Sequence, residues 1–149
     1  MKKFKFSLDR MLDYQQQNMQ KEKNVMGQIM EQIISCENQR KKVETELEQI
    51  HADMDREIRK GTTIYQIRLF TTMIENGKRQ LSGIKSRLNI LEQEKEKQRE
   101  IVVEASKEVT KLEKLKEKQW EEYRHAEAKE QELVISEHVA GQFIRQGGF

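Results

Sequence analysis

The chain has 149 residues, of which 36% are charged, 35% hydrophobic and 6% aromatic, and it contains no proline. Average soluble domains hold about 25% charged residues and about 5% proline, so this composition argues against a sandwich, a barrel or a compact α/β enzyme and favours long helices. The net charge of +2 predicts no basic face for nucleic acid, and the single cysteine, Cys36, excludes an intramolecular disulfide.

A strict heptad pattern covers the first part of the chain. Counted in alternating steps of four and three from Leu8 to Glu57, eleven of the fifteen core positions are apolar. A disordered chain has no reason to keep this repeat, whereas a helix that packs along one narrow stripe requires it. The pattern predicts a helix over about residues 5–59. The polar exceptions are Gln15, Glu22, Arg40 and Glu57.

The best break in the chain follows this helix, at the sequence Arg59-Lys60-Gly61-Thr62-Thr63. Basic residues suit the last turn of a helix, and glycine suits the position just beyond its end. Either threonine can then cap a new helix. The sequence therefore predicts a turn over about residues 60–66.

A second heptad seam begins at Ile67 and reaches Leu133, with fourteen of twenty core positions apolar. It predicts a helix over about residues 64–143, followed by a frayed C-terminus over residues 144–149. The seam is weak from Glu92 to Glu100, where all nine residues are polar. We interpret this stretch as two loose or solvated turns and not as a domain boundary, because no glycine or serine cluster marks a linker.

Two such seams joined by one turn predict an all-α fold, a long antiparallel two-helix coiled coil whose second helix is longer than the first. A single elongated domain would span residues 1–149. Residues whose numbers add to roughly 122–126 should pair, which brings Phe4 and Phe6 level with Trp120. Because the seam is satisfied within one chain, the protein is expected to be a monomer.

Residue types that carry catalysis or bind metals are sparse. The three histidines, His51, His125 and His138, form no HExxH or paired-histidine spacing, and no glycine-rich phosphate loop is present. Two packed helices also offer no deep pocket. We therefore expect neither an enzyme nor a cofactor or metal site. The mixed charges of Glu92–Glu132 are typical of a solvated helix face and not of a nucleic-acid interface.

The end that carries the termini is a candidate partner-binding surface. Aromatic and arginine side chains often dominate interfaces, and the pairing gathers Phe4, Phe6, Arg10, Trp120, Tyr123 and Arg124 there. The aromatic residues would alternatively only seal the end of the coil. The alternating lysines and phenylalanines of residues 2–6 are also compatible with an anionic membrane surface.

The turn is a second candidate surface. Residues 64–74 form the most hydrophobic short segment of the chain, although a turn needs few apolar residues. Part of the segment must close the coil, and the remainder is available to a partner. The candidate residues are Tyr65, Ile67, Phe70 and Ile74.

Three segments resemble one known family. Residues 4–14 (FKFSLDRMLDY) resemble the opening of the FliJ family of flagellar export proteins, F-x-F-x-L-x-x-[LM]-L. Residues 111–123 (KLEKLKEKQWEEY) resemble the family's K-x-L-E-K-L-K-E motif and the E-[YF] that follows it, and residues 130–143 resemble its ending. Ser136-Glu137-His138 departs from the Asp-Glu pair expected in that ending. The resemblance spans nearly the whole chain.

The resemblance implies a coiled coil similar to the central stalk of rotary ATPases. It implies that the end carrying the termini enters the hexameric ring of the flagellar type III export ATPase and promotes ring formation and ATP hydrolysis. The opposite end would approach the membrane-embedded export gate, and export chaperones would be further partners. The expected location is cytoplasmic, peripheral at the inner membrane, with a role in flagellum biogenesis and motility.

Other interpretations remain open at the level of sequence. The stalk protein of an injectisome would share the architecture, although the N-terminal phenylalanine motif favours the flagellar branch. A plain structural coil that dimerises is a second alternative, and a peripheral membrane adaptor is a third. The opening residues lack the apolar core of a signal peptide, and no run of apolar residues is long enough to span a membrane.

Overall fold

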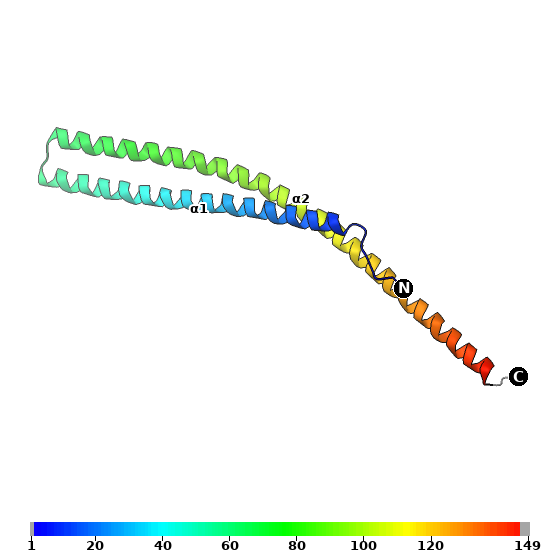
Figure 1. The fold of residues 1–149 in the computed structure, drawn as a ribbon. Helices are drawn as coiled ribbons and strands as arrows, with labels where there is room; N and C mark the ends of the chain where they lie inside the picture. Colours follow the sequence, from blue (N-terminus) through cyan, green and yellow to red (C-terminus); the bar gives the residue numbers. More distant parts are fainter. Residues whose placement is uncertain (1, 147–149) are drawn as a thin grey trace. The chain divides into compact units, whose positions relative to one another are not determined.

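The computed structural model describes residues 2–146 and consists of two helices, α1 (Asp9–Lys60) and α2 (Ile64–Arg145). The helices run antiparallel and pack against each other (Figure 1). Among the described residues there is no strand. With 82 residues against 52, α2 is the longer helix. The predicted all-α fold, with a longer second helix, is confirmed.

The packing divides the chain into two compact units, each with its own buried cluster. Unit 1 combines the chain up to Gln20 with the chain from Val103 onward, and unit 2 is Lys21–Val102. The buried cluster of unit 1 consists of Phe6, Leu12 and Val109. The buried cluster of unit 2 consists of Cys36, Leu88 and Leu91. The single domain over residues 1–149 stays a prediction.

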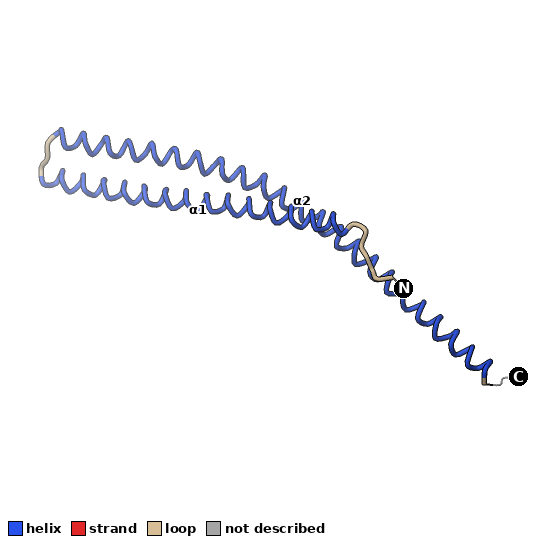
Figure 2. The backbone as a smooth tube through the Cα atoms, viewed as in Figure 1, coloured by secondary structure: helices blue, strands red, loops and turns tan. Residues whose placement is uncertain are grey.

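The loop between the helices follows the capping signals in the sequence (Figure 2). Gly61 has a φ of 88°, a conformation that side-chain-bearing residues avoid, and its N–H donates to the carbonyl of Ile58. Thr63 then caps α2, because its Oγ1 accepts a hydrogen bond from the N–H of Gln66 at 3.2 Å. The break lies where the sequence predicts it, but the loop covers only residues 61–63, so α2 begins at Ile64, inside the turn predicted over residues 60–66.

The pairing of the helices also agrees with the sequence. In unit 2, Leu47 lies against Gly77, and in unit 1, Phe4 lies against Trp120. The residue numbers of both pairs add to 124, inside the predicted range. The contact at Gly77 is close, since an added Cβ would lie 2.4 Å from a methyl carbon of Leu47. Glycine at this core position lets the leucine side chain approach the α2 backbone.

The polar stretch at residues 92–100 contains one residue that is buried and hydrogen-bonded across the seam. Gln98 is only 7% exposed, at a core position of the seam. Its Nε2 donates to the backbone oxygen of Glu22 at 2.9 Å and to the Glu22 carboxylate at 2.6 Å. The interpretation as loose, solvated turns is therefore wrong at this residue. Its amide is satisfied across the seam, and this removes the penalty for burying it.

The start of α1 also differs from the prediction. The helix begins at Asp9 and not at about residue 5. Residues 2–6 are not helical, and in an extended segment every second side chain points the same way. Phe4 and Phe6 can thus both face α2, which a helix would prevent. At the other end, α2 continues to Arg145, beyond the predicted end near residue 143, and residues 147–149 lie outside the described residues.

Candidate partner-binding surfaces

Three aromatic rings in unit 1 form what we call the aromatic clasp, Phe4, Trp120 and Tyr123. The Phe4 ring packs edge-on to Trp120, with ring centroids 5.2 Å apart, and lies 5.6 Å from Tyr123. Trp120 and Tyr123 are stacked at 5.8 Å. These are the distances at which aromatic pairs attract each other. The clasp therefore fixes the N-terminal segment to α2.

Two polar contacts lie next to the clasp and also join the N-terminal part of the chain to α2. The Tyr123 hydroxyl donates to the backbone oxygen of Lys2 at 2.6 Å. The Lys116 Nζ lies 2.9 Å from the carboxylate of Asp9, in the first turn of α1. Phe6 is buried with Leu12 and Val109 instead of joining the rings. Residues 2–6 are thus held against α2 by the buried Phe6 ring, by the Phe4 ring of the clasp and by the hydrogen bond from Tyr123.

The clasp is only partly covered. Trp120 is 43% exposed, so its indole is available to a partner as well as to Phe4. Desolvation raises the pKa of Tyr123, and the carboxylates of Glu127 and Glu130 raise it further. The phenol therefore stays a hydrogen-bond donor at neutral pH. The two arginines predicted at this surface, Arg10 and Arg124, are both exposed.

The C-terminal part of α2 is a further surface in unit 1. From Ala128 to Arg145, every residue except Gly141 is exposed. No site was predicted here. The sequence nevertheless indicates one, because apolar residues continue in the second helix beyond the last residue that the first helix can pair with. The exposed large apolar residues are Leu133, Val134, Ile135, Val139, Phe143 and Ile144.

The four residues predicted at the turn differ in their exposure to solvent. Ile74 is only 8% exposed and belongs to the core of unit 2, so it is not available to a partner. Ile67 and Phe70 are half-buried. Tyr65 is 71% exposed. Its exposed neighbours, which the sequence reasoning did not select as site residues, are Ile58, Ile64, Leu69 and Met73.

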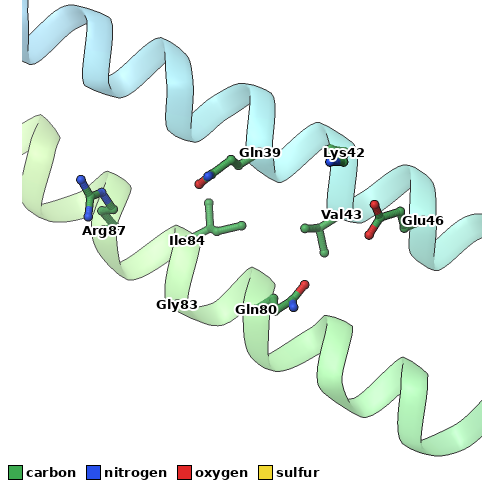
Figure 3. Close-up of a pocket in the computed structure, with 8 residues that line it drawn as sticks. All are labelled: Gln39, Lys42, Val43, Glu46, Gln80, Gly83, Ile84 and Arg87. Atoms are coloured by element: carbon green, nitrogen blue, oxygen red, sulfur yellow. The ribbon is translucent and has the colours of Figure 1, made fainter.

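A shallow groove of about 480 Å³ opens between the helices of unit 2 (Figure 3). Val43 and Ile84 project from the two helices toward each other. Gly83 contributes no side chain, and an added Cβ would meet nothing within 4 Å. The groove was not predicted, although glycines inside a helical pattern were the signal for it. The polar and charged residues that line it are Gln39, Lys42, Glu46, Gln80 and Arg87.

Neither a metal-binding cluster nor a membrane-spanning helix is found in the part of the chain that the structure describes. Within residues 2–146, no group of three or more His, Cys, Asp or Glu side chains is placed to hold a metal ion. None of the described helices is long and apolar enough to cross a membrane. The surfaces instead present aromatic and aliphatic side chains, which suits contacts with other macromolecules.

Fold and surfaces together define an antiparallel two-helix coiled coil with exposed apolar surfaces in both units. The model of one family, described as the flagellar FliJ protein, matches residues 4–148. The chain therefore belongs to the FliJ family, whose members are components of the flagellar export apparatus and not known enzymes. Comparisons with curated proteins and with solved structures give no significant match.

Proposed function

We propose that this protein is a stalk-like component of the flagellar type III export apparatus, which inserts into the hexameric export ATPase and promotes its assembly and activity. The aromatic clasp carries this proposal. A half-exposed tryptophan that packs against Phe4 and Tyr123 is the kind of residue that dominates protein interfaces. The exposed apolar residues of α2 from Leu133 to Ile144 form a second exposed apolar group within unit 1.

The turn of unit 2 is the end that we propose to approach the membrane-embedded export gate. Its support is the exposed apolar group around Tyr65. Export chaperones are further proposed partners. A monomer is consistent with this role, because the buried residues of each unit come from both α1 and α2 of one chain. The proposed location is the cytoplasm, peripheral at the inner membrane.

The test is ATP hydrolysis by the purified export ATPase of the same cell, with and without this protein. The wild-type chain should stimulate hydrolysis, and the double variant Phe4→Ala, Trp120→Ala should lose most of the stimulation. The matched control is Tyr14→Ala, since Tyr14 is an exposed aromatic residue of α1 outside the clasp. Stimulation equal in all three proteins, or absent from the folded wild-type chain, would reject the proposal.

A further inference from the structure

We propose that the tip of unit 2, which we define as residues 58–74, binds the surface of an anionic lipid bilayer. This inference deepens the proposed function, because it names lipid as what the gate-facing end touches. It rests on two properties of the tip, exposed apolar side chains and a net positive charge within residues 58–74. Its test does not involve the ATPase.

The apolar side chains of the tip project from both helices. Ile58 lies near the end of α1, and Ile64 and Tyr65 lie in the first turn of α2. Leu69 and Met73 follow Tyr65 at intervals of four, which places all three on one face of α2. The five residues are 46% to 72% exposed. A protein in water gains nothing by exposing them, whereas the boundary between lipid headgroups and acyl chains accepts such residues.

The charge of the tip has one sign. Between Glu57 and Glu75 the chain holds three basic residues and no acidic one. All three basic side chains are exposed. Basic residues next to exposed apolar ones are attracted to anionic headgroups while the apolar side chains enter the interface. The three residues are Arg59, Lys60 and Arg68.

The C-terminal part of α2 shows that apolar exposure alone does not define such a surface. From Glu127 to Arg145 it exposes apolar residues just as large, among them Leu133 and Phe143. Its charges are four acidic and two basic residues, so an anionic bilayer would repel it. The same chain thus supplies a natural control, with similar apolar exposure but opposite net charge.

The form of the tip favours a bilayer over a protein partner. A protein interface requires a surface of matching shape, and the apolar residues of the tip project from two helix ends that flank a three-residue loop. A fluid bilayer has no shape requirement and admits each side chain separately. Tyr65 adds a ring with a polar hydroxyl, the type of residue that collects at membrane interfaces.

The experiment is cosedimentation of the full chain with vesicles of phosphatidylglycerol and phosphatidylethanolamine, and with vesicles of phosphatidylcholine alone. We expect binding to the anionic vesicles, weaker binding at high salt and at least tenfold weaker binding to the neutral ones. The variant Arg59→Gln, Lys60→Gln, Arg68→Gln should bind the anionic vesicles roughly a hundredfold more weakly, at about fivefold for each basic residue. Tyr65→Ser, Leu69→Ser should also lose most of the binding.

The matched control is Leu133→Ser, Phe143→Ser, which removes one aliphatic and one aromatic residue from the acidic end of α2 and should leave vesicle binding unchanged. All changed side chains are exposed, so helix content by circular dichroism should be retained. Absence of wild-type binding, equal binding to neutral vesicles, or equal loss in the control would overturn the inference. Because the tip variants should still stimulate the ATPase, failure here is distinguishable from failure of the proposed function.

Discussion

Phe4 contacts two rings of α2 from a segment that is not helical. Aromatic pairs contribute about 0.5–1.5 kcal/mol beyond the burial of their area. Phe4→Ala should therefore lower the free energy of unfolding by about 1–3 kcal/mol, since the half-buried ring also loses apolar burial. Denaturant unfolding followed by the fluorescence of Trp120, the only tryptophan, measures this. Tyr14→Ala removes an exposed ring and should change the stability little. Equal effects of the two substitutions would show that the clasp adds nothing.

Tyr123 gives the clasp a dependence on alkaline pH. Desolvation, followed by the charge of Glu127, raises its pKa above the ordinary value of about 10. Because the raised pKa belongs to the folded state, the protonated phenol favours folding. Its contribution is complete below pH about 10 and is lost as the pH rises through the folded-state pKa.

The fluorescence of Trp120 should therefore stay constant from pH 7 to 9 and change above pH about 10, as the hydrogen bond to the Lys2 carbonyl is lost. The variant Tyr123→Phe keeps the ring but has no proton to lose, so this transition should be absent. A transition that is complete below pH 9, or one that persists in the variant, would contradict the assignment.

At the scale of the helices, two glycines of α2 should respond in opposite ways to the same substitution. An added Cβ at Gly77 would lie 2.4 Å from Leu47, which is itself buried, whereas at Gly83 it would meet nothing within 4 Å. Gly83→Ala should stabilise the protein by about 1 kcal/mol through helix propensity. Gly77→Ala should destabilise it, because overpacking costs about 1–3 kcal/mol and outweighs that gain. Thermal unfolding by circular dichroism compares the two variants, and a gain at both positions would show that Leu47 moves aside freely.

Much of the helical architecture could be predicted from the sequence, for physical reasons that particular residues illustrate. The heptad repeat places apolar side chains on one stripe, and Gly61 with Thr63 ends one helix and starts the next. Gln98 was misjudged because its type is polar, and only the position of Glu22 across the seam shows that its amide is satisfied. The start of α1 was missed because the burial of Phe6 depends on a non-helical segment folding onto α2.

The candidate surfaces were predicted less completely than the helices. The sequence brought Phe4, Trp120 and Tyr123 together correctly, since the pairing rule places Phe4 opposite Trp120 and Tyr123 follows Trp120 by three residues on the same helix face. At the turn it selected Ile74, which is buried, and did not select Leu69, which is exposed. Hydrophobicity alone does not say which side of a helix faces its partner. That distinction requires the rotation of α2 about its axis, which the structure supplies.

At the scale of the whole molecule, the chain is a member of the FliJ family whose exposed apolar groups differ in chemistry. The group in unit 1 combines an aromatic clasp with an acidic helix end, and the group in unit 2 combines aliphatic residues and Tyr65 with basic residues. Different chemistry implies different partners. We therefore propose that unit 1 contacts the ATPase and that the tip faces the membrane.

The most direct test of this assignment is photo-crosslinking to the purified export ATPase. A photoreactive phenylalanine analogue would replace Trp120 in one protein and Tyr65 in another, since both side chains are exposed. We expect a crosslink to the ATPase from position 120 and none from position 65. Crosslinking from position 65 alone, or from neither position while the ATPase is stimulated, would contradict the claim that the clasp is the surface that contacts the ATPase.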